Sequence, residues 1–269
     1  MIRRRNGLLL DRRSFLLGAG LTGIGLLGPE RTASAEAAAP ASIRSCRPTD
    51  PLQALRDGNA RFAAAWQQAD QTDIASERAQ WMAALWSGHC FLPSSVLTQG
   101  QAPWASVLTC ADSRVAPEWI FDAAPADLFV IRSAGNTAFA AAIASLEFSV
   151  LELATPLVMV MGHSSCGAVT AARSGAAPTP LLTELLTPIR AAISPDQDLE
   201  AAIKANARET AQQLISRSNV IEAAVNNGSL KIVVGYFDIG SGTVTLVEQR
   251  VNESGSQPSR RQHRDTDVV

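Results

Sequence analysis

The chain has 269 residues, of which 46% are hydrophobic and 18% are charged, and its formal net charge is −2. This composition supplies enough apolar material for one sizeable core and too little charge for a disordered protein, so we expect one main domain. Lys204 and Lys231 are the only lysines, and the absence of a basic stripe excludes nucleic-acid binding.

Residues 1–35 have the pattern of a twin-arginine-type signal peptide. Arg12 and Arg13 precede Ser14-Phe15-Leu16, a glycine-rich apolar stretch follows, and Ala33-Ser34-Ala35 is typical of a cleavage site. A membrane anchor is the alternative, but the apolar run is shorter than the ~20 residues that a spanning helix needs. We therefore expect export to the periplasm or the extracellular space, with no stable membrane span after removal of the signal. Without its six arginines and two acidic residues, the formal charge falls to about −6.

The next segments predict a lead-in and a helical arm. Residues 36–49 are rich in Ala, Pro and Ser and are expected to be a flexible linker, whereas residues 50–250 are expected to form the catalytic domain. Asp50 followed by Pro51 is a typical helix start, and the apolar spacing up to Phe62 predicts an amphipathic N-terminal helix. A second helix is expected over about 74–86, with a packing stripe that includes Trp81.

Strands and helices alternate through the rest of the domain. The apolar runs predict strands at 104–108, 128–131, 156–161, 230–237 and 243–248, and helices at 138–154, from about 167, and over 199–226. Such alternation is typical of a mostly parallel sheet covered on both faces. We therefore predict an α/β fold with a mostly parallel central β-sheet flanked by helices and an N-terminal helical arm. Residues 251–269 are expected to be a polar disordered tail.

Two segments carry candidate metal ligands. Cys110, Asp112 and Arg114 follow one predicted strand, and His163 and Cys166 follow another. If residues 110–114 are extended, the thiolate, the carboxylate and the guanidinium lie on one face, because strand side chains alternate. Two thiolates with one imidazole, and too few cysteines for an iron–sulfur cluster, favour one zinc ion per chain.

The fourth position of such a zinc site decides its chemistry. Asp112 could occupy it in a closed state, or water could occupy it in an open, catalytic state. A bidentate pair with Arg114 would draw the carboxylate of Asp112 off the metal, which favours the open state. The remaining cysteines, Cys46 and Cys90, could form one disulfide or be independent thiols, and His89 beside Cys90 is more often a packed residue than a ligand.

These motifs resemble those of β-class carbonic anhydrases. The resemblance covers about residues 50–250 and rests on the segments 58–62, 110–118, 132–136, 145–147, 162–169 and 235–242. It implies that Cys110, His163 and Cys166 bind zinc and that Asp112 and Arg114 form the catalytic gate. It also implies that Gln101 reaches the site of a partner subunit in a homodimer or higher oligomer, around which the N-terminal arm wraps.

The function that this resemblance implies is reversible hydration of carbon dioxide to bicarbonate and a proton by zinc-bound hydroxide. Since two thiolates reduce the charge of the metal, we expect activity to rise toward alkaline pH. Two alternatives remain: a hydrolase of carbonyl sulfide or carbon disulfide with the same fold, and a non-catalytic zinc protein with Asp112 permanently on the metal. A redox thiol protein is disfavoured because Cys110 and Cys166 form no C-x-x-C motif.

Overall fold

The computed structural model describes residues 41–175 and 179–248. The predicted signal peptide, the first part of the lead-in and the predicted tail lie outside these residues. Five strands form one sheet in the order β2-β1-β3-β4-β5. The strands are β1 (Ala105–Cys110), β2 (Leu128–Ser133), β3 (Leu157–His163), β4 (Lys231–Asp238) and β5 (Thr243–Leu246). The first four pair in parallel, whereas β5 returns antiparallel to β4, which confirms the predicted mostly parallel sheet.

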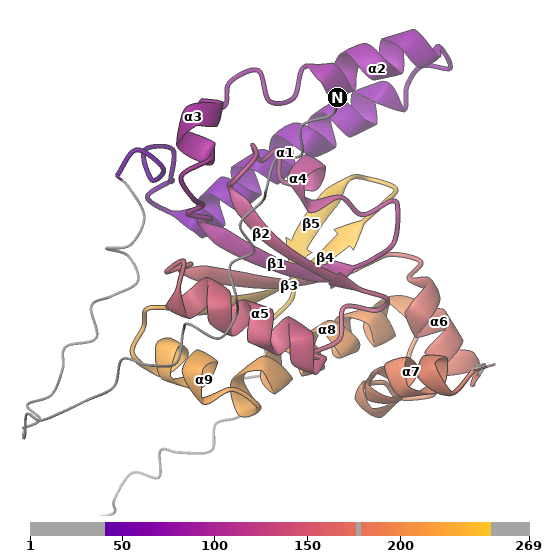
Figure 1. Cartoon of the computed structure of the whole chain (residues 1–269). Helices are drawn as coiled ribbons and strands as arrows, with labels where there is room; N and C mark the ends of the chain where they lie inside the picture. The colour runs from indigo at the N-terminus through magenta and orange to yellow at the C-terminus, as the bar shows by residue number, and fades with distance from the viewer. Residues whose placement is uncertain (1–40, 176–178, 249–269) are drawn as a thin grey trace, which may run out of the picture. The chain divides into compact units, whose positions relative to one another are not determined.

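The nine helices assigned within the described residues cover both faces of this sheet (Figure 1). On one face lie α1 (Pro51–Ala69), α2 (Ala75–Ala83), α3 (Ser94–Leu97) and α4 (Pro117–Ile120). On the other face lie α5 (Ala140–Leu151), α6 (Gly167–Ser174), α7 (Pro180–Ala192), α8 (Leu199–Ser216) and α9 (Asn219–Asn226). Helix α1 begins as predicted, with the carboxylate of Asp50 accepting a 3.0 Å hydrogen bond from the Gln53 N–H.

Successive strand residues divide between two hydrophobic clusters, because side chains alternate across a strand. In β3, Met159 packs in the cluster that includes α1, whereas Val160 packs in the cluster of α5 to α9. All seven residues of β3 are buried. The strands that end at the candidate ligands are therefore fixed from both sides.

The predicted helix over 199–226 is two helices. Helix α8 ends at Ser216 and α9 begins at Asn219. Between them, the Ser218 hydroxyl accepts a 3.1 Å hydrogen bond from the Ile221 N–H and donates a 2.6 Å bond to Glu147. This side-chain cap competes with continuation of the helix, and the apolar periodicity did not reveal it. Helix α7 was also not predicted.

The described part of the lead-in packs against the domain, although a flexible segment was predicted over 36–49. Ile43 is 3% exposed, Cys46 forms a disulfide with Cys90, and Arg47 donates hydrogen bonds to four backbone carbonyls. The sequence left the pairing of Cys46 and Cys90 open, and the structure joins them. Across residues 41–175 and 179–248, no helix has the length and apolar character that a membrane span requires.

Candidate metal centre

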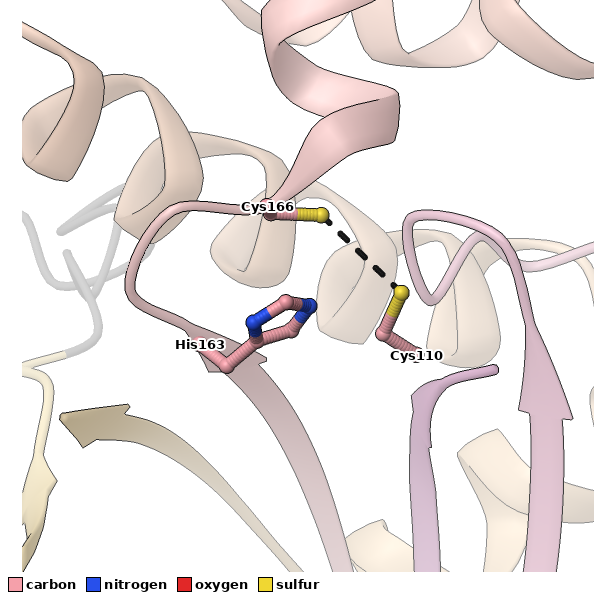
Figure 2. A group of neighbouring side chains, drawn as sticks. All are labelled: Cys110, His163 and Cys166. Carbon is pink, nitrogen blue, oxygen red and sulfur yellow. Dashed lines mark hydrogen bonds between the residues drawn. The ribbon is translucent and has the colours of Figure 1, made fainter. Parts of the chain in front are cut away.

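Cys110, His163 and Cys166 meet at the carboxyl edge of the sheet. Cys110 ends β1, His163 ends the neighbouring strand β3, and Cys166 is the residue before the first turn of α6. Their ligand atoms lie within 4.8 Å of one another, and all three residues are buried. Figure 2 shows the two sulfur atoms and the imidazole ring pointing toward one common space. The structure thus brings together the three candidate metal ligands that the sequence pointed to.

The spacing of the sulfur atoms fits a tetrahedral metal ion. The Cys110 Sγ and Cys166 Sγ atoms are 3.9 Å apart. Two Zn–S bonds at a tetrahedral angle would place the sulfurs roughly 3.8 Å apart. Two thiolates and one imidazole are also a ligand set that zinc prefers over hard cations.

The imidazole of His163 is prepared for the same role. Its Nδ1 atom lies 2.9 Å from the Ser164 carbonyl oxygen, so Nδ1 carries the proton and donates. The lone pair is then on Nε2, which is buried and has no hydrogen-bond partner among the described residues. A buried, unpartnered nitrogen that faces two sulfurs is the feature that a metal ion would satisfy.

The surroundings of the two thiols favour a thiolate at Cys110. Its sulfur interacts with Cys166 and accepts a 3.3 Å hydrogen bond from the Gly135 N–H. The hydrogen bond from Cys166 is the main cause that lowers the pKa of Cys110, and the Gly135 N–H acts in the same direction. The pKa of Cys166 is raised, first by its bond to Cys110 and second by burial.

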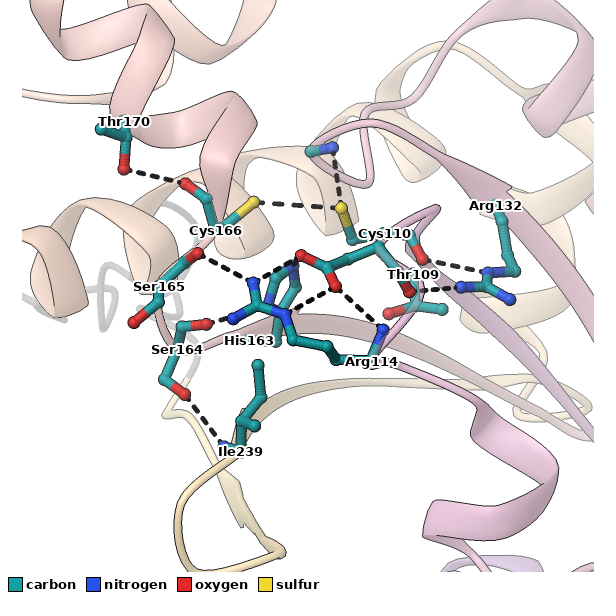
Figure 3. A network of polar contacts seen from close by, with 12 residues as sticks. Thr109, Cys110, Arg114, Arg132, His163, Ser164, Ser165, Cys166, Thr170 and Ile239 are labelled. Carbon is teal, nitrogen blue, oxygen red and sulfur yellow. Dashed lines mark hydrogen bonds and ion pairs between the residues drawn. The ribbon is translucent and has the colours of Figure 1, made fainter.

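Asp112 and Arg114 form a bidentate pair beside these ligands. The Arg114 Nε donates to Oδ1 of Asp112 at 2.9 Å, and Nη2 donates to Oδ2 at 2.6 Å. These side-chain hydrogen bonds hold the pKa of Asp112 well below its usual range. Asp112 Oδ2 is 3.9 Å from Nε2 of His163, so the carboxylate borders the ligand group. Arg114 also approaches the Ser165 carbonyl at 3.3 Å (Figure 3).

Residues 110–114 are not extended, so the condition under which strand alternation would place their side chains on one face is not met. The Arg114 N–H donates to Asp112 Oδ1 at 3.0 Å, and the Val115 N–H donates to the Asp112 carbonyl at 3.0 Å. The aspartate side chain thereby closes a tight turn directly after β1. Asp112 and Arg114 come together through this turn and not through strand alternation.

Arg132 supports the turn from β2. It donates from Nε to the Cys110 carbonyl at 3.0 Å and from Nη2 to the Asp112 carbonyl at 2.7 Å (Figure 3). Arg132 lies in one of the segments that carry the family resemblance, but the motif did not predict this contact. Arg132 lies one residue before the end of β2 and pairs with Thr109 in the parallel register. This position beside the end of β1 was the sequence signal that could have placed its side chain near Cys110.

Gln101 is not part of this group within one chain. It lies before β1, whereas Cys110 is the last residue of β1. The six residues of the strand alone separate the two ends by roughly 17 Å. The Gln101 side chain is exposed and makes no hydrogen bond to the described residues. Any contact of Gln101 with a metal centre would therefore be with that of another subunit.

His89, the other histidine in the described ranges, lies away from the metal ligands. Its Nε2 is 2.8 Å from Oδ1 of Asp122, whose Oδ2 accepts a 2.6 Å bond from Arg61 of α1. Burial would raise the pKa of Asp122, but the contacts of His89, Arg61 and the Trp86 N–H together lower it. These residues connect α1 to the segment after α2, which agrees with a packing role for His89.

Known proteins are similar to this chain in sequence and in fold. The family model described as "Carbonic anhydrase" matches residues 105–244. The carbonic anhydrase of Mycolicibacterium smegmatis is 35% identical over 211 residues, which cover 74% of this chain and 93% of that protein. The chain is therefore similar to this relative over nearly the whole of the relative's length.

Solved structures of β-carbonic anhydrases are similar to this chain in fold. The β-carbonic anhydrase CafA of Aspergillus fumigatus has a TM-score of 0.51 and 25% identity, over 64% of this chain and 88% of that chain. The Coccomyxa β-carbonic anhydrase, solved in complex with acetazolamide, has a TM-score of 0.50 and 25% identity, over 57% of this chain and 75% of that chain.

Proposed function

Because the chain belongs to the β-class carbonic anhydrase family, we propose that it catalyses the reversible hydration of carbon dioxide to bicarbonate and a proton, with one zinc ion held by Cys110, His163 and Cys166. The observation that carries the proposal is the buried Nε2 of His163, which faces two sulfurs 3.9 Å apart and has no hydrogen-bond partner in the described ranges. Three protein ligands leave a fourth position for water, as in catalytic zinc sites.

Bound zinc would supply a Lewis acid that lowers the pKa of water and so provides a nucleophile for carbon dioxide near neutral pH. Asp112 stays ionised because Arg114 holds its pKa low, so its carboxylate can only accept hydrogen bonds. It would orient the reacting water by accepting a hydrogen bond from it. Since both oxygens of Asp112 already accept from Arg114, the geometry supports the open state of the gate.

Gln101 would complete the site in a neighbouring subunit. Its distance from Cys110 in its own chain and its exposed side chain support this role, and its amide could donate a hydrogen bond to substrate oxygen. Helix α2 supports a homodimer or higher oligomer, since none of its residues is buried and Trp81 is 47% exposed. Sedimentation equilibrium of the purified protein tests this assembly.

Export through the twin-arginine route remains part of the proposal. The Cys46–Cys90 disulfide supports an oxidising compartment, where such bonds persist. Replacing Arg12 and Arg13 together by lysine is expected to retain the protein in the cytoplasm of the producing cell. Export of this variant at the wild-type level would count against the route.

Stopped-flow hydration of carbon dioxide at pH 7 and pH 9, with zinc determined on the same sample, tests the function directly. We expect fast hydration with about one zinc per chain and a higher rate at pH 9. Acetazolamide, present in the Coccomyxa structure, is added in a parallel assay to test whether it binds and changes the rate. Zinc without hydration at either pH would contradict the proposal and direct the next assay to carbonyl sulfide.

A further inference from the structure

We propose that Ile43, Cys46 and Arg47 form a bracket that positions Gln101 for the neighbouring subunit's metal site. The proposal rests on the proposed function, because it assumes that Gln101 acts there. The three residues lie in a stretch of chain whose composition predicted only a flexible linker. These three residues are called the N-terminal bracket below.

The bracket holds the backbone on both sides of Gln101. Before it, the buried side chain of Ile43 packs beside Gly100, where a Cβ atom would lie 3.5 Å from Ile43 Cδ1. After it, Arg47 donates from Nε to the Ala102 carbonyl at 3.1 Å. The residues that flank Gln101 are thus fixed, while the Gln101 side chain stays exposed.

Arg47 also anchors this segment to the core of the domain. Its Nη2 donates to the Pro103 carbonyl at 2.6 Å, and the same nitrogen lies 3.4 Å and 3.2 Å from the carbonyls of Leu153 and Ala154. The last two carbonyls belong to the connection between α5 and the buried strand β3. One guanidinium therefore joins the Gln101 segment to the connection that leads into a metal-ligand strand.

The disulfide fixes the far end of the same segment. Cys46 is adjacent to Arg47, and its bond to Cys90 holds the chain before α3, which leads to Gln101. Residues 46 and 47 thereby restrain residues 90, 102 and 103, which enclose Gln101. A catalytic amide that must reach another subunit needs such restraint, because a misplacement of 1 Å can cost about a hundredfold in rate.

A double-mutant cycle tests whether Arg47 acts through Gln101. Zinc-loaded wild type, Gln101→Ala, Arg47→Ala and the double variant are compared for kcat, KM, zinc content and subunit assembly. We expect Gln101→Ala to lower kcat by about tenfold or more. Arg47→Ala should also lower kcat, by at most the loss measured for Gln101→Ala, with zinc content and assembly unchanged. In the Gln101→Ala background, Arg47→Ala should have no further effect on kcat.

Arg208 of α8 provides a matched control. It donates a hydrogen bond to the Glu248 carbonyl, and α8 lies on the face of the sheet opposite to α1 (Figure 1). Arg208→Ala removes the same kind of bond and should leave kcat near the wild-type value. If Arg47→Ala fails to assemble, Arg47→Lys and the paired variant Cys46→Ser with Cys90→Ser enter the same cycle.

Equal losses of kcat from the Arg47 change in both backgrounds would overturn the bracket while leaving the proposed function intact. A wild-type kcat for Gln101→Ala in an active enzyme would remove Gln101 from catalysis and overturn the bracket with it. A zinc-loaded wild type without hydration would overturn the proposed function itself, and with it the purpose of the bracket.

Discussion

Replacing Gly135 by alanine is expected to lower the free energy of unfolding by roughly 2–5 kcal/mol. Gly135 has a φ of +79°, and an added Cβ would lie 2.4 Å from Cδ1 of Ile189 and 3.1 Å from the Cβ of Ala168. The residue cannot move aside without loss, because its N–H donates to Cys110 Sγ and its carbonyl accepts a 2.7 Å bond from Asn206.

Two separate terms make up this magnitude. The left-handed backbone conformation costs an L-residue about 1–2 kcal/mol. Overpacking against Ile189 adds about 1–3 kcal/mol, since the core does not yield freely. The sum is a large part of the 5–15 kcal/mol that typically stabilises a domain. Any displacement of the Gly135 N–H would also weaken the stabilisation of the Cys110 thiolate.

Urea unfolding at fixed protein and zinc concentrations measures this change, because both zinc and assembly shift the unfolding midpoint. Ile189→Val removes the clashing Cδ1 atom and by itself should cost about 0.5–1.5 kcal/mol. Combined with Gly135→Ala, it should relieve the overpacking against Ile189. The double variant should therefore lose less unfolding free energy than the two single losses added together. Strict additivity, or a Gly135→Ala protein as stable as the wild type, would refute the reasoning.

Three further outcomes are expected. Asp112→Ala should keep its zinc and lose most of its hydration activity, measured by metal analysis and stopped flow; loss of the metal would instead make Asp112 a structural ligand. Asp122→Asn should lower the free energy of unfolding in urea at pH 7. The pKa of Asp122 is lower in the folded state than in the unfolded chain. The stability that its ionised form contributes is therefore complete above the ordinary pKa of about 4 and is lost as the pH falls through the folded-state pKa. The difference in unfolding free energy between wild type and Asp122→Asn should accordingly narrow below pH 4 and not above it. Ser218→Ala removes the cap of α9 and its bond to Glu147, and should cost about 1–2 kcal/mol in the same urea assay; a change below 0.5 kcal/mol would show that solvent replaces both bonds.

The sequence predicted the features that depend on residue type and strand order. Apolar runs predicted all five strands, and ligand chemistry predicted the grouping of Cys110, His163 and Cys166, because parallel strands end at one edge. Local hydrogen bonds were not predictable from these patterns. Ser218 divides a continuous helical pattern, and the Asp112 side chain closes a turn where the sequence left open an extended segment.

Long-range tethers also escaped prediction. Composition alone indicated a flexible lead-in, but Arg47 finds carbonyl partners on segments 55 and 106 residues away. The Cys46–Cys90 pairing depends on the same packing, so sequence could offer it only as one of two alternatives. Gln101 was predicted from the family resemblance, and its role remains to be tested.

The two pairs of cysteines lie in separate stretches of the chain. The disulfide closes residues 46–90 around the helical arm, and metal coordination by both other cysteines would close residues 110–166 around the β1–β3 core. By the chain-entropy relation for cross-links, the disulfide restricts the unfolded chain by about 4 kcal/mol. A metal ion would stabilise the second loop differently, by binding to the folded chain alone. The loops do not overlap, so losing one leaves the other intact. With the proposed zinc bound, reduction of the disulfide would therefore loosen the arm, and removal of the metal would loosen the core.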